Sequence, residues 1–119
     1  MIRYVILIAY RPGQWEAADA AGRQRYFDAH DAFHAYVLEH GRILASAALA
    51  DAETATTVRP GAAGPTVTDG PFVELTEQIG GYYDVELPDL DAAIAAAGLL
   101  HPSYLLEIRP VTTVEGYHE

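Results

Sequence analysis

The chain predicts an α+β domain of the ferredoxin-like type, a βαββαβ arrangement with an extra hairpin. Two observations support this prediction. Two helix-forming stretches each lie between segments whose apolar residues alternate as in strands. Two β-prone segments, TATTV and PTVT, also flank the turn-forming residues 60–64, which adds the hairpin. The 119 residues suit one core, so residues 1–119 are assigned to a single domain.

The first strand is expected over residues 2–10, and it decides what must surround the sheet. Ile2, Tyr4, Ile6, Ile8 and Tyr10 share one face, and Arg3, Val5, Leu7 and Ala9 share the other. Both faces are largely apolar, so we expect the sheet to be covered on both sides.

The first helical region is expected in two parts. Residues 14–21 are rich in alanine and acidic residues, and Gly22 is a candidate break after them. The main helix is then predicted over residues 23–40, with Gly41 as its C-terminal stop.

The second half of the chain supplies the remaining elements. Residues 88–98 combine a Pro-Asp entrance, an apolar stripe and a closing glycine, which predicts a helix. Strands are predicted over residues 42–50, 79–87 and 104–111.

Composition and charge exclude several functions. A formal net charge of −10, with no lysine, argues against nucleic acid and anionic membranes as partners. The absence of cysteine excludes disulfides and thiolate chemistry. The apolar run near the N-terminus is too short for a membrane span and lacks a cleavage site, so a cytoplasmic location is expected. No nucleotide-binding glycine pattern is present, and no cofactor is predicted.

The segment HDAFH, residues 30–34, carries two histidines one helical turn apart. On a helical wheel His30 lies inside the apolar arc and His34 beside it, whereas Asp31 points to the polar side. Three interpretations stay open. The rings are buried and hydrogen-bonded to tyrosines or carbonyl groups, or they line a pocket and transfer a proton, or they bind a divalent metal. A metal site needs a third ligand, such as His101 or an acidic residue, and no metal ligand set is assigned.

A longer pattern resembles the DGPF branch of the YCII-related family. It comprises Asp69-Gly70-Pro71-Phe72, Glu74, Glu77-Gln78, Gly80-Gly81-Tyr82 and the closing Glu107-Ile108-Arg109-Pro110-Val111. The resemblance covers essentially the whole chain and implies a dimeric α+β barrel, in which the sheets of two subunits pack face to face. We therefore expect a homodimer, which would also cover the second face of the first strand.

The resemblance also suggests functions. The wider YCII-related group looks like a set of small enzymes with an acid–base pair, a histidine on the first helix and an aspartate near the second strand. One lineage is associated with dehydrochlorination. By position His34 is the nearest counterpart of that histidine, and Asp51 is a plausible carboxylate. The sequence departs from the branch at Leu75 and Thr76, where threonine and lysine are usual.

Further polar residues are candidates for ligand binding. Glu74 and Glu77 would repel each other if they faced one cavity, which would raise the pKa of one carboxyl group. Asp69 is expected to bond nearby backbone amides, and Tyr82 and Tyr83 to point to opposite faces of their strand. The full set of binding candidates is Asp69, Glu74, Glu77, Tyr82, His101 and Arg109.

Three functional hypotheses follow. The first is a cofactor-independent isomerase, lyase or cyclase that acts on a small organic molecule, with His30, His34 and Asp51 as catalytic candidates. The second is a non-catalytic module that binds a ligand or a protein and acts in sigma-factor regulation, because some DGPF relatives are encoded beside or fused to sigma factors. The third is a divalent-metal binder that uses His30 and His34.

Overall fold

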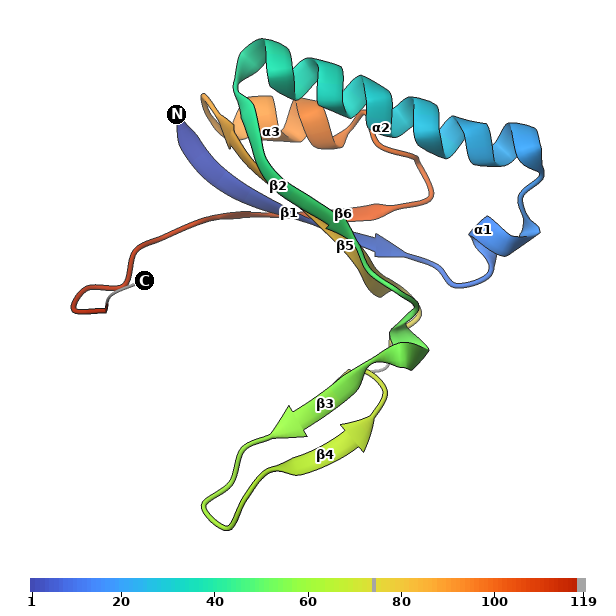
Figure 1. Cartoon of the computed structure of the whole chain (residues 1–119). Coiled ribbons are helices and arrows are strands. Elements are labelled where there is room, and N and C mark those ends of the chain that lie inside the picture. The colour runs from blue at the N-terminus through green and yellow to red at the C-terminus, as the bar shows by residue number, and fades with distance from the viewer. Residues whose placement is uncertain (74, 118–119) are drawn as a thin grey trace.

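A computed structural model describes residues 1–73 and 75–117, and it has the expected α+β architecture (Figure 1). Within these residues, one antiparallel sheet contains four strands in the order β2-β5-β1-β6. These are β1 (Ile2–Tyr10), β2 (Arg42–Ala48), β5 (Gln78–Leu87) and β6 (Leu105–Pro110). With one helical region after β1 and another after β5, this order is that of a ferredoxin-like sheet.

The helices lie on one face of the sheet (Figure 1). They are α1 (Gln14–Ala17), α2 (Ala20–His40) and α3 (Leu90–Ala97). The expected break at Gly22 is wrong, because Gly22 lies inside α2 and the chain breaks at residues 18–19. The side chain of Asp19 accepts a hydrogen bond of 2.7 Å from the backbone N–H of Gly22, which caps α2 at its start.

The main core lies between the helices and the sheet. Ile6, Phe33, Val37, Val85 and Leu87 are fully buried there. Side chains of this size contribute roughly 1.5–3 kcal/mol each when they leave water. This core explains which face of β1 the helices cover, since Ile6 points toward α2 and its neighbours in sequence point away.

The other sheet face, which we call the open face, carries Arg3, Val5, Leu7 and Ala9 of β1. The cross-strand register adds residues from the neighbouring strands, namely Asp84, Glu86 and Tyr82 of β5, Leu105, Glu107 and Arg109 of β6, and Arg42 of β2. In the described residues no helix covers this face, and its apolar side chains are half-buried or exposed.

The charges of the open face neutralise one another. The guanidinium of Arg3 donates two hydrogen bonds, of 2.9 and 2.7 Å, to the carboxylate of the buried Asp84. Arg109 pairs with Glu107 at 3.1 Å. Arg42 pairs with Glu86. This face is therefore locally neutral, although the chain carries a net charge of −10.

The expected hairpin forms and extends away from the sheet (Figure 1). Its strands are β3 (Thr56–Arg59) and β4 (Thr66–Asp69), and the short 3-10 helix η1 (Ala52–Thr54) precedes it. Gly70 closes the base of the hairpin with a φ of +95°, a conformation that favours glycine, and its N–H donates to the carbonyl of Ala55 at 2.7 Å.

The ends of some elements differ from the predicted ones. β2 ends at Ala48 instead of residue 50, and β6 spans residues 105–110 instead of 104–111. No helix among the described residues has the length and apolar character that crossing a membrane requires.

Candidate functional site

The two histidines of α2 converge on one tyrosine of the sheet. His30 and His34 are half-buried and lie one turn apart, so their rings share one side of the helix. The hydroxyl of Tyr83 lies 2.7 Å from Nδ1 of His30 and 3.1 Å from Nε2 of His34. Tyr83 points toward α2, as does Val85 two residues further along β5. Asp84, between them, points to the opposite face of the sheet.

Hydrogen bonding constrains the protons of this cluster. A phenol has one proton, so Tyr83 donates to one imidazole and accepts from the other. Nε2 of His30 lies 3.4 Å from the hydroxyl of Tyr104, which extends the chain of bonds at its far end. The chain Tyr104–His30–Tyr83–His34 can therefore run in either direction, and reversing it changes the tautomer of His30.

Burial keeps the middle of this chain neutral. It lowers the pKa of His30 below its usual value, and the nearby His34 acts in the same direction, while Asp31 opposes both weakly. Burial also raises the pKa of Tyr83 to about 12. The pKa of Tyr104 is raised as well, again mainly by burial. At pH 7 His30 is a neutral imidazole and Tyr83 is a phenol.

A small cavity of about 230 Å³ gives this cluster an opening. His30, Tyr83 and Tyr104 line it, together with backbone and small side chains of β2 and β5 such as Ser46. This volume is below the roughly 300–1,000 Å³ of typical ligand sites, so the cavity suits only a very small molecule, and His30 is the ring base that lines it. His30 therefore combines two features of a general base, because it borders the cavity and contacts a second titratable group, the hydroxyl of Tyr83.

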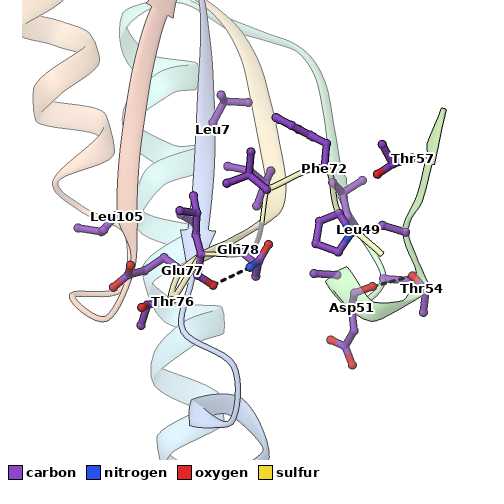
Figure 2. Close-up of a pocket in the computed structure, with 18 of the residues that line it drawn as sticks. Leu7, Leu49, Asp51, Thr54, Thr57, Phe72, Thr76, Glu77, Gln78 and Leu105 are labelled. Atoms are coloured by element: carbon purple, nitrogen blue, oxygen red, sulfur yellow. Dashed lines mark hydrogen bonds between the residues drawn. The ribbon is translucent and has the colours of Figure 1, made fainter. Parts of the chain in front are cut away.

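The structure does not bring Asp51 to the histidines. Asp51 is the cap residue before η1, and it lines a different and larger cavity, on the open face of the sheet (Figure 2). His30 lines the cavity on the helix side. The expected histidine–aspartate pair is therefore not assembled within one chain. The residue that joins the two histidines is Tyr83. Strand alternation predicted that Tyr82 and Tyr83 point to opposite faces of the sheet, but it could not predict that Tyr83 lies opposite His30.

The candidates around the DGPF segment are dispersed. Asp69 is exposed, and among the described residues its carboxylate forms no hydrogen bond, so the expected bonds to backbone amides are not found. The hydroxyl of Thr57 instead donates to the carbonyl of Gly70 at 2.7 Å and holds the turn. Glu77 lines the larger cavity and meets Arg11 at 3.5 Å. Glu74 lies outside the described residues.

His101 belongs to a separate cluster in the turn before β6. Its Nδ1 accepts from the backbone N–H of Ser103 at 3.1 Å and lies 2.8 Å from the hydroxyl of the same residue. Its ring stacks on Tyr26 with a centroid distance of 3.7 Å. Desolvation lowers the pKa of His101, and Arg25 adds to this effect. These contacts give His101 a structural role in the turn before β6.

The last two candidates lie on the open face. Tyr82 points away from the helices, opposite to Tyr83, as strand alternation predicted. Arg109 pairs with Glu107 of its own strand at 3.1 Å. Tyr82 nevertheless borders the small cavity that His30 lines, whereas Arg109 does not.

Comparison with known proteins places the chain in a family. The family model of the YCII-related domain matches residues 2–101. The chain belongs to the YCII-related domain family. A search of curated proteins finds no match. In this YCII-related domain the first long helix carries His30 and His34, and both rings lie beside the hydroxyl of Tyr83.

The site of this YCII-related domain does not present a metal ligand set. In the described part of the chain, no group of three or more histidine or acidic side chains is placed to hold a metal ion. The nitrogens of His30 and His34 that face the sheet are bonded to the hydroxyl of Tyr83. The cluster is a hydrogen-bonded chain of two imidazoles and two phenols.

Proposed function

We propose that this YCII-related protein is a cofactor-independent acid–base enzyme that transfers a proton on a small organic molecule bound beside His30. The observation that carries the proposal is the pair of contacts made by Tyr83, 2.7 Å to His30 and 3.1 Å to His34, at the wall of a cavity. Proton transfer by a positioned histidine is the commonest form of general acid–base catalysis.

The contacts permit a balanced first step. The substrate displaces the hydroxyl of Tyr104 from Nε2 of His30, which it meets at 3.4 Å, and Nε2 then takes a proton from a carbon acid in the cavity. Nδ1 of His30 gives its own proton to the oxygen of Tyr83, and the phenol proton passes to Nε2 of His34. The positive charge then rests on His34, one helical turn from the substrate carbanion. Return of the proton to another carbon gives an isomerisation, whereas loss of a leaving group gives an elimination.

Exchange of substrate protons with solvent tests this function. Small ketones and 2-oxo acids are incubated in D₂O with the protein, and deuterium incorporation is followed by proton NMR. We expect incorporation with the unaltered protein, none above background with His30→Asn, and slower incorporation with Tyr83→Phe. His40→Asn is the matched control, because His40 is exposed at the end of α2 and contacts the carbonyl of Tyr36. Equal rates for the unaltered protein and His30→Asn would exclude the proposal.

We also propose that two copies pair through the open face. Its apolar residues, Val5, Leu7 and Tyr82 among them, form a surface of the kind that marks an interface. Its internal ion pairs leave this face without an excess of either charge, so two copies would not bring unpaired like charges together there. Light scattering at micromolar concentration should give twice the chain mass of 12.9 kDa. A mass of one chain contradicts this part of the proposal.

The second candidate function is a binding module of the DGPF branch, linked to sigma-factor regulation. The residues 69–72 that name the branch begin at the last residue of β4, and Pro71 and Phe72 line the large cavity, which supports ligand binding without catalysis. A cytoplasmic location suits either function. The deuterium-exchange experiment separates the enzyme from the binding module, because a binding module would not catalyse deuterium incorporation into any carbon acid.

A further inference from the structure

We infer that the substrate of His30 is an uncharged carbonyl compound with an aromatic ring, and that a second cavity beside Tyr104 receives this ring. The inference rests on the proposed function and deepens it, because it names the class of molecule that the His30 site takes. It depends on the size of the His30 cavity, on an aromatic cavity that adjoins it, and on the position of Tyr104 between the two.

The second cavity, which we call the aromatic cavity, lies where the end of β1 meets α1 and the first turns of α2. Its volume is about 130 Å³, and four rings line it, those of Tyr10, Trp15, Tyr26 and Tyr104. Trp15 meets Tyr26 edge to face with a centroid distance of 5.5 Å, and Tyr26 lies 5.6 Å from Tyr104. Aromatic rings pack on one another in such edge and offset geometries, so these walls suit a further aromatic ring.

Tyr104 forms a common wall of the two cavities, since its side chain lines both. The cavities also adjoin at Tyr10, whose ring lies over Gly80 of the His30 cavity. A Cβ atom at Gly80 would come within 2.5 Å of that ring. Neither the 230 Å³ of the His30 cavity nor the 130 Å³ of the aromatic cavity reaches the roughly 300 Å³ of a typical ligand site, but the two together exceed it.

The proposed reaction already requires Tyr104 to move. Its hydroxyl lies 3.4 Å from Nε2 of His30, which is the longest contact in the hydrogen-bonded chain. Tyr104 is half-buried and precedes the first residue of β6, so its side chain can turn without disturbing the strand. A substrate that displaces the hydroxyl from Nε2 therefore also opens the wall toward the aromatic cavity. A molecule that spans both cavities gains contacts that a very small molecule cannot make.

The lining of the His30 cavity favours an uncharged reacting group. Among the described residues, no carboxylate or guanidinium lines this cavity, and His30 itself is neutral at pH 7. A charged group there would lose water without gaining an ionic partner. In the aromatic cavity Arg11 is the charged side chain, and it pairs with Glu77 at 3.5 Å. The reacting carbonyl group is therefore expected to carry no neighbouring carboxylate.

Deuterium exchange with three ketones tests the inference on the full-length protein. The ketones are benzylacetone, its cyclohexyl analogue and butanone. In the first two the ring is separated from the carbonyl group by two carbons, so the methyl protons next to the carbonyl are equally acidic in all three. We expect exchange at low ketone concentration, which reports kcat/KM, to be roughly tenfold faster for benzylacetone than for butanone, with the cyclohexyl analogue between them. Equal rates for benzylacetone and butanone would overturn the inference and leave the proposed function standing.

Variants locate the ring. Trp15→Leu should lower the ratio of benzylacetone to butanone exchange roughly threefold, because it replaces one aromatic wall by an aliphatic one. Tyr36→Leu is the matched control on α2, since Tyr36 stacks on His40 and lines neither cavity. It should leave the ratio unchanged, with folding of both variants checked by circular dichroism. An equal fall of the ratio in Tyr36→Leu would contradict the assignment of the ring to the aromatic cavity.

The hydroxyl of Tyr104 can be tested separately. Tyr104→Phe keeps the ring and removes the hydroxyl that the substrate displaces, so the KM of benzylacetone should fall roughly threefold. An unchanged KM would show that the substrate does not displace Tyr104.

A binding measurement that needs no catalysis completes the test. Trp15 is the single tryptophan of the chain, so its fluorescence reports on the aromatic cavity. In His30→Asn we expect benzylacetone to change this fluorescence with saturation, whereas butanone causes at most a change that is linear in its concentration. Saturation without exchange of any ketone by the unaltered protein would refute the proposed function while the aromatic cavity stands as a binding site. A fluorescence change by benzylacetone that does not saturate would overturn the inference.

Discussion

The hydroxyl of Tyr83 lies 2.7 Å from Nδ1 of His30, although the two residues are 53 positions apart in the chain. One comes from the middle of the longest helix and the other from a central strand. The packing of α2 on the sheet therefore brings two helix histidines and one strand tyrosine into one hydrogen-bonded chain. Four predictions follow from this arrangement and from the open face.

The first prediction concerns acid stability and His30. Because burial lowers the folded-state pKa of His30, the unfolded chain binds a proton more readily below about pH 6.5. The stability associated with neutral His30 is thus fully present above that pH and is lost as the pH falls toward the lower folded-state pKa. Urea unfolding at pH 7.5 and 5.5 should show a smaller loss for His30→Asn than for the unaltered protein. Identical losses would mean that His30 ionises equally in both states.

The second prediction concerns the phenol of Tyr83. Its pKa of about 12 places its ionisation above that of an ordinary tyrosine, near 10. Ultraviolet titration of the folded protein should therefore show a late step that is missing in Tyr83→Phe. The substitution also leaves two imidazole nitrogens without their partner, which should lower the free energy of unfolding by about 1–3 kcal/mol. Tyr104→Phe should cost less, since its bond to His30 is 3.4 Å long.

The third prediction concerns the end of α2. A Cβ atom at Gly41 would overlap the carbonyl oxygen of Glu86 on β5. Gly41→Ala must therefore push the helix end away from the sheet, and should lower the free energy of unfolding by about 1–3 kcal/mol. Gly98→Ala is the control, because the backbone there is α-helical and the nearest atom lies 3.3 Å away. Urea midpoints measure both, and equal midpoints for the two variants would contradict the steric argument.

The fourth prediction concerns association through the open face. Val5 stands opposite Asp84 on one side and Arg109 on the other. In Val5→Lys the new ammonium can reach Asp84 within one chain, so the domain should still fold. The substitution also adds a positive charge to a face whose charges are otherwise paired. Two copies that pair through this face would have to bury that added charge. Light scattering should show the variant at the mass of one chain, with an unchanged circular dichroism spectrum. A dimeric Val5→Lys protein would place the interface elsewhere.

Much of the fold could be predicted because short-range patterns encode it. The alternation of Tyr4, Ile6 and Ile8 against Val5 and Leu7 identified β1 and its two faces. The expected elements are all present, with the helix break moved to the capping residue Asp19. The break was misplaced because a side-chain cap outweighed the modest helix cost of Gly22.

The inward orientation of the histidines was also a local property. A period of 3.6 residues places His30 and His34 on one side of α2 whatever the helix packs against. The sequence by itself thus determined which side chains look toward the sheet. It could not determine what they meet there.

Tertiary structure alone decided the partners. The register of β5 beside β1 and the axial position of α2 bring Tyr83 under both rings, and sequence patterns constrain neither to within one residue. The same packing places Asp51 at the other cavity, which the resemblance to known proteins had not indicated. Periodicity specifies directions, while distances between residues far apart in the chain depend on how complete elements pack.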